Sequence, residues 1–181
     1  MKNNRTIAEQ GLGGNTRLSS YKEGCIGMVP HISTGSYYSS GRREIAKAMK
    51  LGNTDAIRLA AVAIATAVKF SKDAILVPVP SHLGYATYTL ELANEIARLT
   101  GSEVADVLKG AQRDMLYDIK KRHKPVSVEY LGVYATKELP QDRPIYYVDN
   151  VVATGATAKA VFRTFGRGTM LTYAHAIRHG C

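Results

Sequence analysis

Residues 145–157, IYYVDNVVATGAT, decide the fold that this 181-residue sequence predicts. The run 145–148 is apolar, β-branched and aromatic, which is typical of a buried strand, and it ends at Asp149 and Asn150. Apolar residues then recur at helical spacing after a run of small residues: Ala158, Val161, Phe162 and Phe165. The order is therefore a strand, a turn and a helix.

The turn is expected in the small-residue run Ala153, Thr154, Gly155, Ala156 and Thr157. Its backbone N–H groups and the positive end of the following helix would converge on one spot, which suits a phosphate. Asp149, at the end of the strand, can accept hydrogen bonds from two neighbouring hydroxyls, as a ribose presents them. One loop could thus bind both ends of a sugar phosphate. The alternative is an ordinary turn between strand and helix, which also favours small residues.

This pattern closely resembles the phosphoribosyl-diphosphate (PRPP) loop of the type I phosphoribosyltransferases, in which two adjacent acids precede Thr-Gly-x-Thr. The resemblance implies that residues 153–157 bind the 5-phosphate and that Asp149 and Asn150 bind the ribose hydroxyls in the catalytic site. Asn150 stands where the family usually has a second acid. Asparagine can still bond a hydroxyl, but it adds no negative charge beside a developing oxocarbenium ion.

A second strand is predicted over 74–79, a continuous apolar run of the kind that parallel sheets bury on both faces. Pro80, Ser81 and His82 follow it, before a helical pattern over 85–99. Type I phosphoribosyltransferases place a pyrophosphate-binding loop at such a strand end, so the resemblance makes these three residues pyrophosphate ligands. The alternative is that the prolines simply end the strand.

A long polar connection follows a strand predicted over 103–108. It contains Arg113 and the basic cluster Lys120, Lys121 and Arg122, and connections of this length are usually functional or disordered. The resemblance implies a basic loop that closes over the pyrophosphate, with Arg113 catalytic and the cluster binding pyrophosphate. The alternative is a solvated loop without a ligand.

Strands that alternate with helices predict an α/β fold: a single domain whose mainly parallel, twisted sheet is flanked by helices and binds ligands at the carboxyl ends of its strands. The order of the motifs over about residues 35–178 is similar to that of the competence-protein F (ComF-like) branch. Residues 1–20 are expected to be poorly ordered and 21–181 to form the domain. A small variable hood is expected over 21–40 and the C-terminal tail.

The remaining elements follow from periodicity and from turn residues. A hairpin is expected within 25–38, strands are expected within 126–135 and over 169–177, and helices are expected over 42–51 and from Thr54 to 68, with Thr54 as the N-cap.

The net charge of +9, from 24 Lys and Arg against 15 Asp and Glu, attracts anions such as a polyphosphate, nucleic acid or an acidic protein. Cys25 and Cys181 show no metal-ligand spacing, and two cysteines favour a reducing, cytoplasmic location. The longest apolar run, 59–68, is too short to span a membrane. His175 and His179 are spaced like metal ligands, but they are expected on or beyond a terminal strand, so no protein metal site is predicted.

The leading hypothesis is a transferase that moves the 5-phosphoribosyl group of PRPP to a nitrogen acceptor of unidentified structure, in nucleotide metabolism. Mg²⁺ would arrive bound to PRPP. One alternative is a non-catalytic PRPP or nucleotide sensor, or an accessory to DNA uptake, on the same fold. Another is a nucleic-acid-binding module with a vestigial site, and weak nucleic-acid binding through the net charge and a homodimer both stay open.

Overall fold

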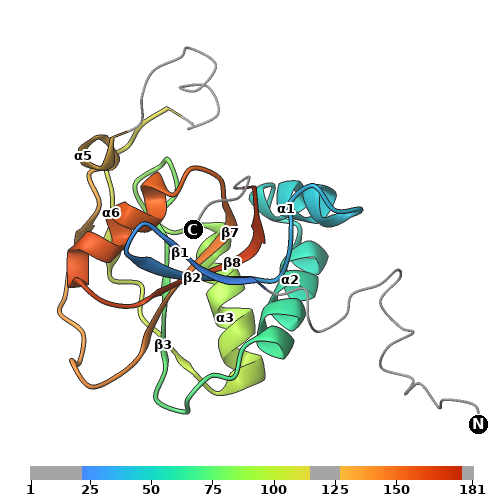
Figure 1. Ribbon diagram of the computed structural model, residues 1–181, viewed down its shortest axis with the longest axis horizontal. Coiled ribbons are helices and arrows are strands. Elements are labelled where there is room, and N and C mark those ends of the chain that lie inside the picture. Colours follow the sequence, from blue (N-terminus) through green and yellow to red (C-terminus); the bar gives the residue numbers. More distant parts are fainter. Residues whose placement is uncertain (1–21, 115–126, 177–181) are drawn as a thin grey trace, which may run out of the picture.

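The computed structural model describes residues 22–114 and 127–176 (Figure 1). A six-stranded sheet with the order β1-β2-β8-β7-β3-β4 forms its centre. Its strands are β1 (Lys22–Ile26), β2 (Val29–Ser33), β3 (Ile75–Pro78), β4 (Glu103–Val104), β7 (Ile145–Val152) and β8 (Thr169–His175). Every neighbouring pair is parallel except β1 with β2. The predicted α/β class with a mainly parallel sheet is therefore confirmed, and the arrangement is compatible with a Rossmann-like fold.

Three helices cover one face of the sheet and one helix covers the other (Figure 1). The first three are α1 (Arg42–Lys50), α2 (Thr54–Ala67) and α3 (Tyr88–Thr100), and the fourth is α6 (Ala156–Phe165). Both faces of the central strands are therefore buried, which explains why all four residues of β3 are buried and why its sequence is continuously apolar.

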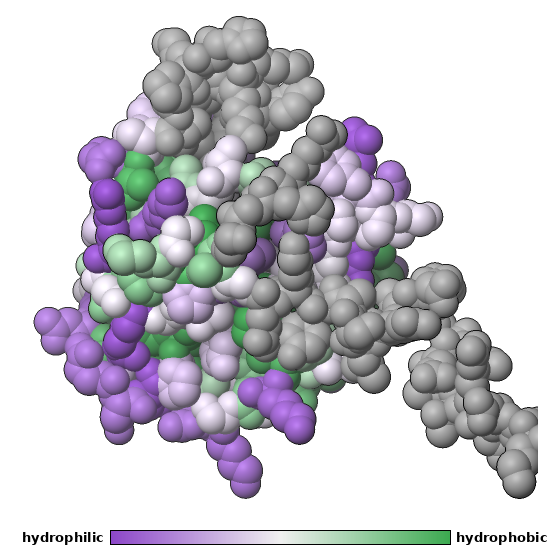
Figure 2. Space-filling view, in the orientation of Figure 1, coloured by the Kyte–Doolittle hydropathy of each residue, from purple (hydrophilic) through white to green (hydrophobic). Residues whose placement is uncertain are grey.

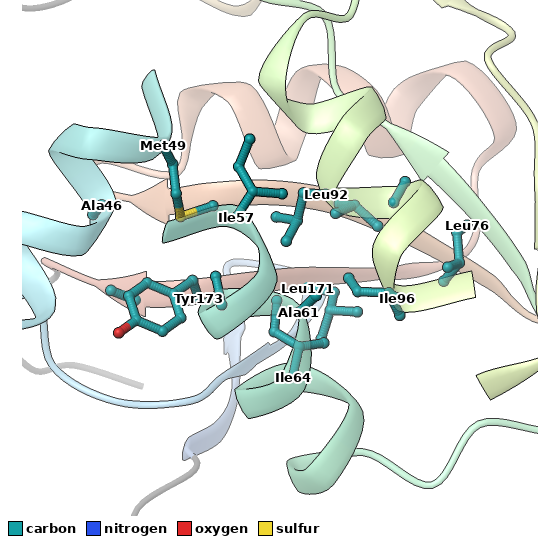
Figure 3. Close-up of a cluster of buried hydrophobic side chains, with 14 of the residues drawn as sticks. Ala46, Met49, Ile57, Ala61, Ile64, Leu76, Leu92, Ile96, Leu171 and Tyr173 are labelled. Carbon is teal, nitrogen blue, oxygen red and sulfur yellow. The ribbon is translucent and has the colours of Figure 1, made fainter. Parts of the chain in front are cut away.

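The larger core lies between the sheet and the first three helices (Figure 3). Helices α2 and α3 meet through Ala60, Ala61 and Ile64 on one side and Leu92 and Ile96 on the other, all completely buried. The alanines let the helix axes approach closely, while each large aliphatic side chain contributes about 1.5–3 kcal/mol by leaving water. A smaller core beneath α6 contains Tyr147, Met170 and Val161.

A short second sheet, β5 (Leu108–Lys109) with β6 (Tyr134–Ala135), and helix α5 (Val128–Leu131) lie beside α6. The strand predicted over 103–108 is wrong, because the backbone turns after Val104 and the two ends of that run join different sheets. The strand predicted within 126–135 is also wrong over α5. Ser127 caps that helix by accepting a hydrogen bond from the N–H of Tyr130, and Gly132 ends it in the left-handed region at φ 54°.

Other boundaries differ in detail. The hairpin is confirmed, but its strands belong to the main sheet, because β2 pairs with β8, so the small hood predicted over 21–40 is wrong there. Strand β7 continues through Asp149 and Asn150 to Val152 instead of ending before them. Asn53, and not Thr54, caps α2, since its side chain accepts a hydrogen bond from the N–H of Ala56.

Residues 1–20 and the C-terminal tail lie outside the described residues. No helix in the described ranges is both long and apolar enough to cross a membrane.

Candidate functional site at the carboxyl ends of the strands

Asp149 lies just beyond the point where β7 stops pairing with its neighbour β3. The last backbone hydrogen bond between them runs from the N–H of Val79 to the carbonyl oxygen of Val148, at 3.0 Å. Beyond it, β7 pairs only with β8, and Asp149 lies opposite Thr172. This stagger opens one side of Asp149, which is half-buried, at the edge of the sheet where parallel α/β folds bind ligands.

The carboxylate of Asp149 is held by two donors. Its Oδ1 accepts the N–H of Asn150 at 2.7 Å and the hydroxyl of Tyr88, the first residue of α3, at 3.4 Å. Burial raises the pKa of Asp149, and the N–H of Asn150, Lys50, Tyr88 and Arg113 each lower it in part. Because the loss of water outweighs these contacts, the charged form of Asp149 costs the protein stability.

Asn150 fixes the positions of three elements around Asp149. Its side chain is 2% exposed, and its Nδ2 donates to the carbonyl oxygen of Ala46 in α1 at 3.0 Å. Its Oδ1 lies 3.2 Å from the Tyr88 hydroxyl, whose single hydrogen is shared between this oxygen and Oδ1 of Asp149, and these contacts join β7 to α3. Only the amide nitrogen can donate to a carbonyl, so these partners define the orientation of the amide. These bonds leave one amide hydrogen and one lone pair of Oδ1 unused, but a ribose hydroxyl would have to reach a side chain that is almost completely buried.

Arg113 lies in the same cluster as Asp149. Burial lowers the pKa of the Arg113 guanidinium, and the nearby Tyr130, Asp149 and Tyr88 each raise it. Its Nε is buried and has no hydrogen-bond partner among the described residues. A buried guanidinium nitrogen without a partner in the described ranges is suited to bind a negatively charged ligand.

The loop after β3 positions Arg113. The N–H of Arg113 donates to the carbonyl oxygen of His82 at 2.9 Å, and the N–H of Gly110 donates to that of Gly84 at the same distance. Gly84 has φ 87°, and a Cβ atom there would lie 2.5 Å from the oxygen of Gly110. Only glycine permits this close approach, so the loop after β3 and the start of the polar connection are joined.

The three residues predicted to bind pyrophosphate lie in this joined pair of loops. Pro80 is buried, whereas Ser81 and His82 are half-buried. The hydroxyl oxygen of Ser81 accepts the N–H of Leu83 at 3.2 Å, so it also stabilises its own turn. The basic cluster Lys120, Lys121 and Arg122 lies outside the described residues.

A turn of small residues leads from β7 into α6, as predicted, but it is shorter than expected, because α6 already begins at Ala156 and includes Thr157. Ala153 and Thr154 are exposed, Gly155 and Ala156 are buried, and Thr157 is half-buried. The first backbone bond of α6 runs from Lys159 N–H to Gly155 oxygen at 2.9 Å, so the N–H groups of residues 156–158 have no partner within the helix. These donors and the helix dipole make the turn suitable for an anion.

Ile26, at the end of β1, covers Gly155. A Cβ atom on Gly155 would lie 2.1 Å from Cγ2 of Ile26, and Gly155 has φ 79°. Both the left-handed backbone and the contact with Ile26 therefore require glycine in the Thr-Gly-Ala-Thr sequence. The first hairpin of the chain thus shapes the turn.

The histidines contribute polar contacts inside the sheet. His31 in β2 bonds the hydroxyl of Thr172 at 3.0 Å, and His175 in β8 bonds that of Ser33 at 3.1 Å. Burial, followed by the nearby His175, lowers the pKa of His31 to about 4. No group of three or more His, Cys, Asp or Glu in the described ranges could hold a metal ion. His179 lies outside these ranges.

Three residues around the site were missed from the sequence: Tyr88, Lys50 and Ile26. Lys50 ends α1 and Tyr88 begins α3. The apolar periodicity of these helices explains most of the surrounding sequence, so nothing local marks the two residues as partners of Asp149. Their positions near the predicted carboxyl edge of the sheet were the one usable signal.

Comparisons of this chain with protein-family models, with curated proteins and with solved structures found no match in any of the three.

Proposed function

We propose that this chain is a phosphoribosyltransferase of the type I kind, which transfers the 5-phosphoribosyl group of PRPP to a nitrogen nucleophile and releases pyrophosphate. The observation that carries the proposal is the placement of an acid and a buried cation at the carboxyl ends of the strands. Asp149 lies where β7 leads toward α6, and Arg113, whose buried Nε has no partner among the described residues, is joined through His82 to the loop after β3. A site with an acid that can accept hydrogen bonds from hydroxyls and a cation that can bind phosphates suits a sugar diphosphate.

Each end of PRPP has a candidate partner. The backbone N–H groups at the start of α6 and the hydroxyls of Thr154 and Thr157 would bind the 5-phosphate. Asp149 would accept the ribose hydroxyls through Oδ2, because its hydrogen bonds from the described residues both go to Oδ1. Arg113, with Ser81 and His82 beside it, would bind the pyrophosphate.

The transfer exchanges one bond at C1 of the ribose. The bond from C1 to the pyrophosphate oxygen breaks and its electron pair leaves with pyrophosphate, while the lone pair of the acceptor nitrogen forms the new bond and its proton passes to solvent. Arg113 would favour this step by stabilising negative charge on the leaving group. Mg²⁺ would enter as part of the substrate, since it usually binds through one or two carboxylates together with substrate phosphates.

Calorimetric titration with PRPP and Mg²⁺ tests the binding step. The native protein should bind, Asp149→Asn should bind at least about tenfold more weakly through the loss of a charged acceptor, and Arg113→Gln should also weaken binding. The matched control is Asp142→Asn, which changes an exposed acid in the turn before β7. Failure of the native protein to bind PRPP or ribose 5-phosphate at millimolar concentration would overturn the proposal.

A second candidate function is PRPP sensing without transfer. The buried, internally bonded Asn150 favours it, because no second carboxylate stands beside Asp149 at this position. Single-turnover pyrophosphate release, measured with a panel of heteroaromatic bases and amines, separates the two functions. Release with a defined acceptor supports the transferase, whereas tight PRPP binding without release for any acceptor supports the sensor.

A further inference from the structure

One side of α1 is a ridge of positive charge. The α1 ridge consists of Arg43, Lys47 and Lys50, whose spacing of four and three residues puts them on one face of the helix. All three are exposed, whereas Ala46 and Met49 of the same helix are buried in the core. Figure 2 shows hydrophilic surface over this part of the molecule.

The cations of the α1 ridge have no close ion-pair partner among the described residues. None of the three side chains forms an ion pair within 4.0 Å of a carboxylate in the described part of the chain. Lys50 interacts electrostatically with Asp149, so the ridge ends beside the candidate site. Three cations in line, with no carboxylate of the described ranges within ion-pair distance, produce a positive potential that attracts a polyanion.

An open hollow of about 450 Å³ adjoins the ridge where α1 begins. It is lined by Tyr38, Ser39, Ser40, Gly41, Arg43 and Glu44. Tyr38 is 65% exposed, and its ring is supported by an edge contact with Tyr37, at 5.6 Å between centroids. A supported, exposed aromatic ring beside hydroxyls and a guanidinium provides both a stacking surface and polar partners for a planar base.

We propose that the hollow and the α1 ridge bind single-stranded nucleic acid, with one base stacked on Tyr38 and successive phosphates along Arg43, Lys47 and Lys50. The combination favours this partner over other polyanions. An acidic peptide or a polyphosphate would use the cations but not the ring, and a duplex keeps its bases stacked on each other. The inference does not rest on PRPP binding, because Tyr38, Arg43 and Lys47 take no part in the proposed transfer and only Lys50, at the end of the ridge, adjoins Asp149.

Fluorescence anisotropy with a labelled oligothymidylate of about 12 nucleotides, measured over a range of salt concentrations, tests the proposal. The variant R43Q/K47Q/K50Q should bind more weakly, and its slope of log affinity against log salt should fall by about 2, since each phosphate contact contributes about 0.7. The control K69Q/K72Q/K137Q removes the same charge from exposed positions that precede β3 and β7, at the amino ends of these strands. It should leave the slope within about 0.5 of the native value.

Tyr38 separates base stacking from charge. Tyr38→Ala should weaken binding by about tenfold, because stacking on one aromatic ring contributes about 1–3 kcal/mol, while Tyr38→Phe should bind like the native protein. The double variant R43Q/K47Q, which leaves Lys50 beside Asp149 unchanged, repeats the charge test if the triple variant does not fold.

Equal losses in the two triple variants would overturn the proposal, since net charge alone would then explain the binding. It would also be overturned if Tyr38→Ala bound like the native protein, or if a duplex or polyglutamate of equal charge bound as tightly as the oligothymidylate.

Discussion

Replacing Asn150 by aspartate should destabilise the protein, although aspartate is the residue that the type I pattern would favour there. The side chain is 2% exposed and its Nδ2 donates to the carbonyl oxygen of Ala46. A carboxylate at this position cannot donate, so the Ala46 oxygen would lose this bond and face a negative charge instead, at a cost of about 1–3 kcal/mol. The new charge would also lie directly beside Asp149 in a buried site.

The cost should depend on pH with a defined sign. When it is protonated, the introduced carboxyl group can donate to Ala46, so the folded state should hold this proton to a pH well above about 3.9, the ordinary value for aspartate. The folded-state pKa is then raised, and stability falls as the pH rises from the unfolded-state value toward the folded-state value. We expect a loss of about 1 kcal/mol or less at a pH of about 4.5 and of about 2–4 kcal/mol at a pH of about 8.

Urea denaturation followed by circular dichroism at the two pH values measures this loss. With a slope of about 2 kcal/mol per M, the midpoint at the higher pH should fall by about 1–2 M. The matched control is Asn53→Asp, an exposed position where aspartate caps a helix as well as asparagine does, and its midpoint should hardly change. If Asn150→Asp were as stable as the native protein at the higher pH, the bond to Ala46 would contribute nothing and Asn150 would not be an anchor.

Three further changes test the same region. Asp149→Asn should raise the free energy of unfolding at neutral pH, because burial raises the pKa of Asp149 and the charged form destabilises the folded state. This gain should vanish below about pH 3.9, and urea titrations at the two pH values measure it. The same difference between variant and native protein at both pH values would mean that the site is solvated. Tyr88→Phe should raise the pKa of Asp149 further, because the hydroxyl stabilises the carboxylate. A carbon-13 titration of the Asp149 carboxyl measures this pKa, and an unchanged value would contradict the prediction. Gly155→Ala should lower the free energy of unfolding by about 2–4 kcal/mol, because of the backbone angle and the contact with Ile26. In a double-mutant cycle, adding Ile26→Ala should recover the part of this loss that is due to the contact. If the losses of the two single variants simply add, the contact is refuted.

The central strands and the helices could be predicted well from the sequence because their patterns are local. Burial of β3 on both faces produces its unbroken apolar run, and the small residues before α6 reflect a turn that Ile26 and a positive φ at Gly155 restrict to glycine. The wrong predictions of strands occur where the local sequence pattern differs from the pairing of the strands in the sheet. The run 103–108 is apolar enough for one strand, but its two ends pair with different partners, β3 and β6, and only tertiary contacts decide such a split.

The site divides in the same way. Asp149 and Arg113 could be proposed from the sequence because Asp149 follows a predicted parallel strand, where such folds bind ligands, and Arg113 lies in an unusually long polar connection. The role of Asn150 could not, since it depends on a carbonyl oxygen in α1 and a hydroxyl in α3, neither of which has a signature near Asn150 in the sequence. An asparagine that donates to Ala46 holds α1, and with it Lys50, beside Asp149. At this position the asparagine therefore supplies a donor that joins β7 to α1, which a second carboxylate could not do.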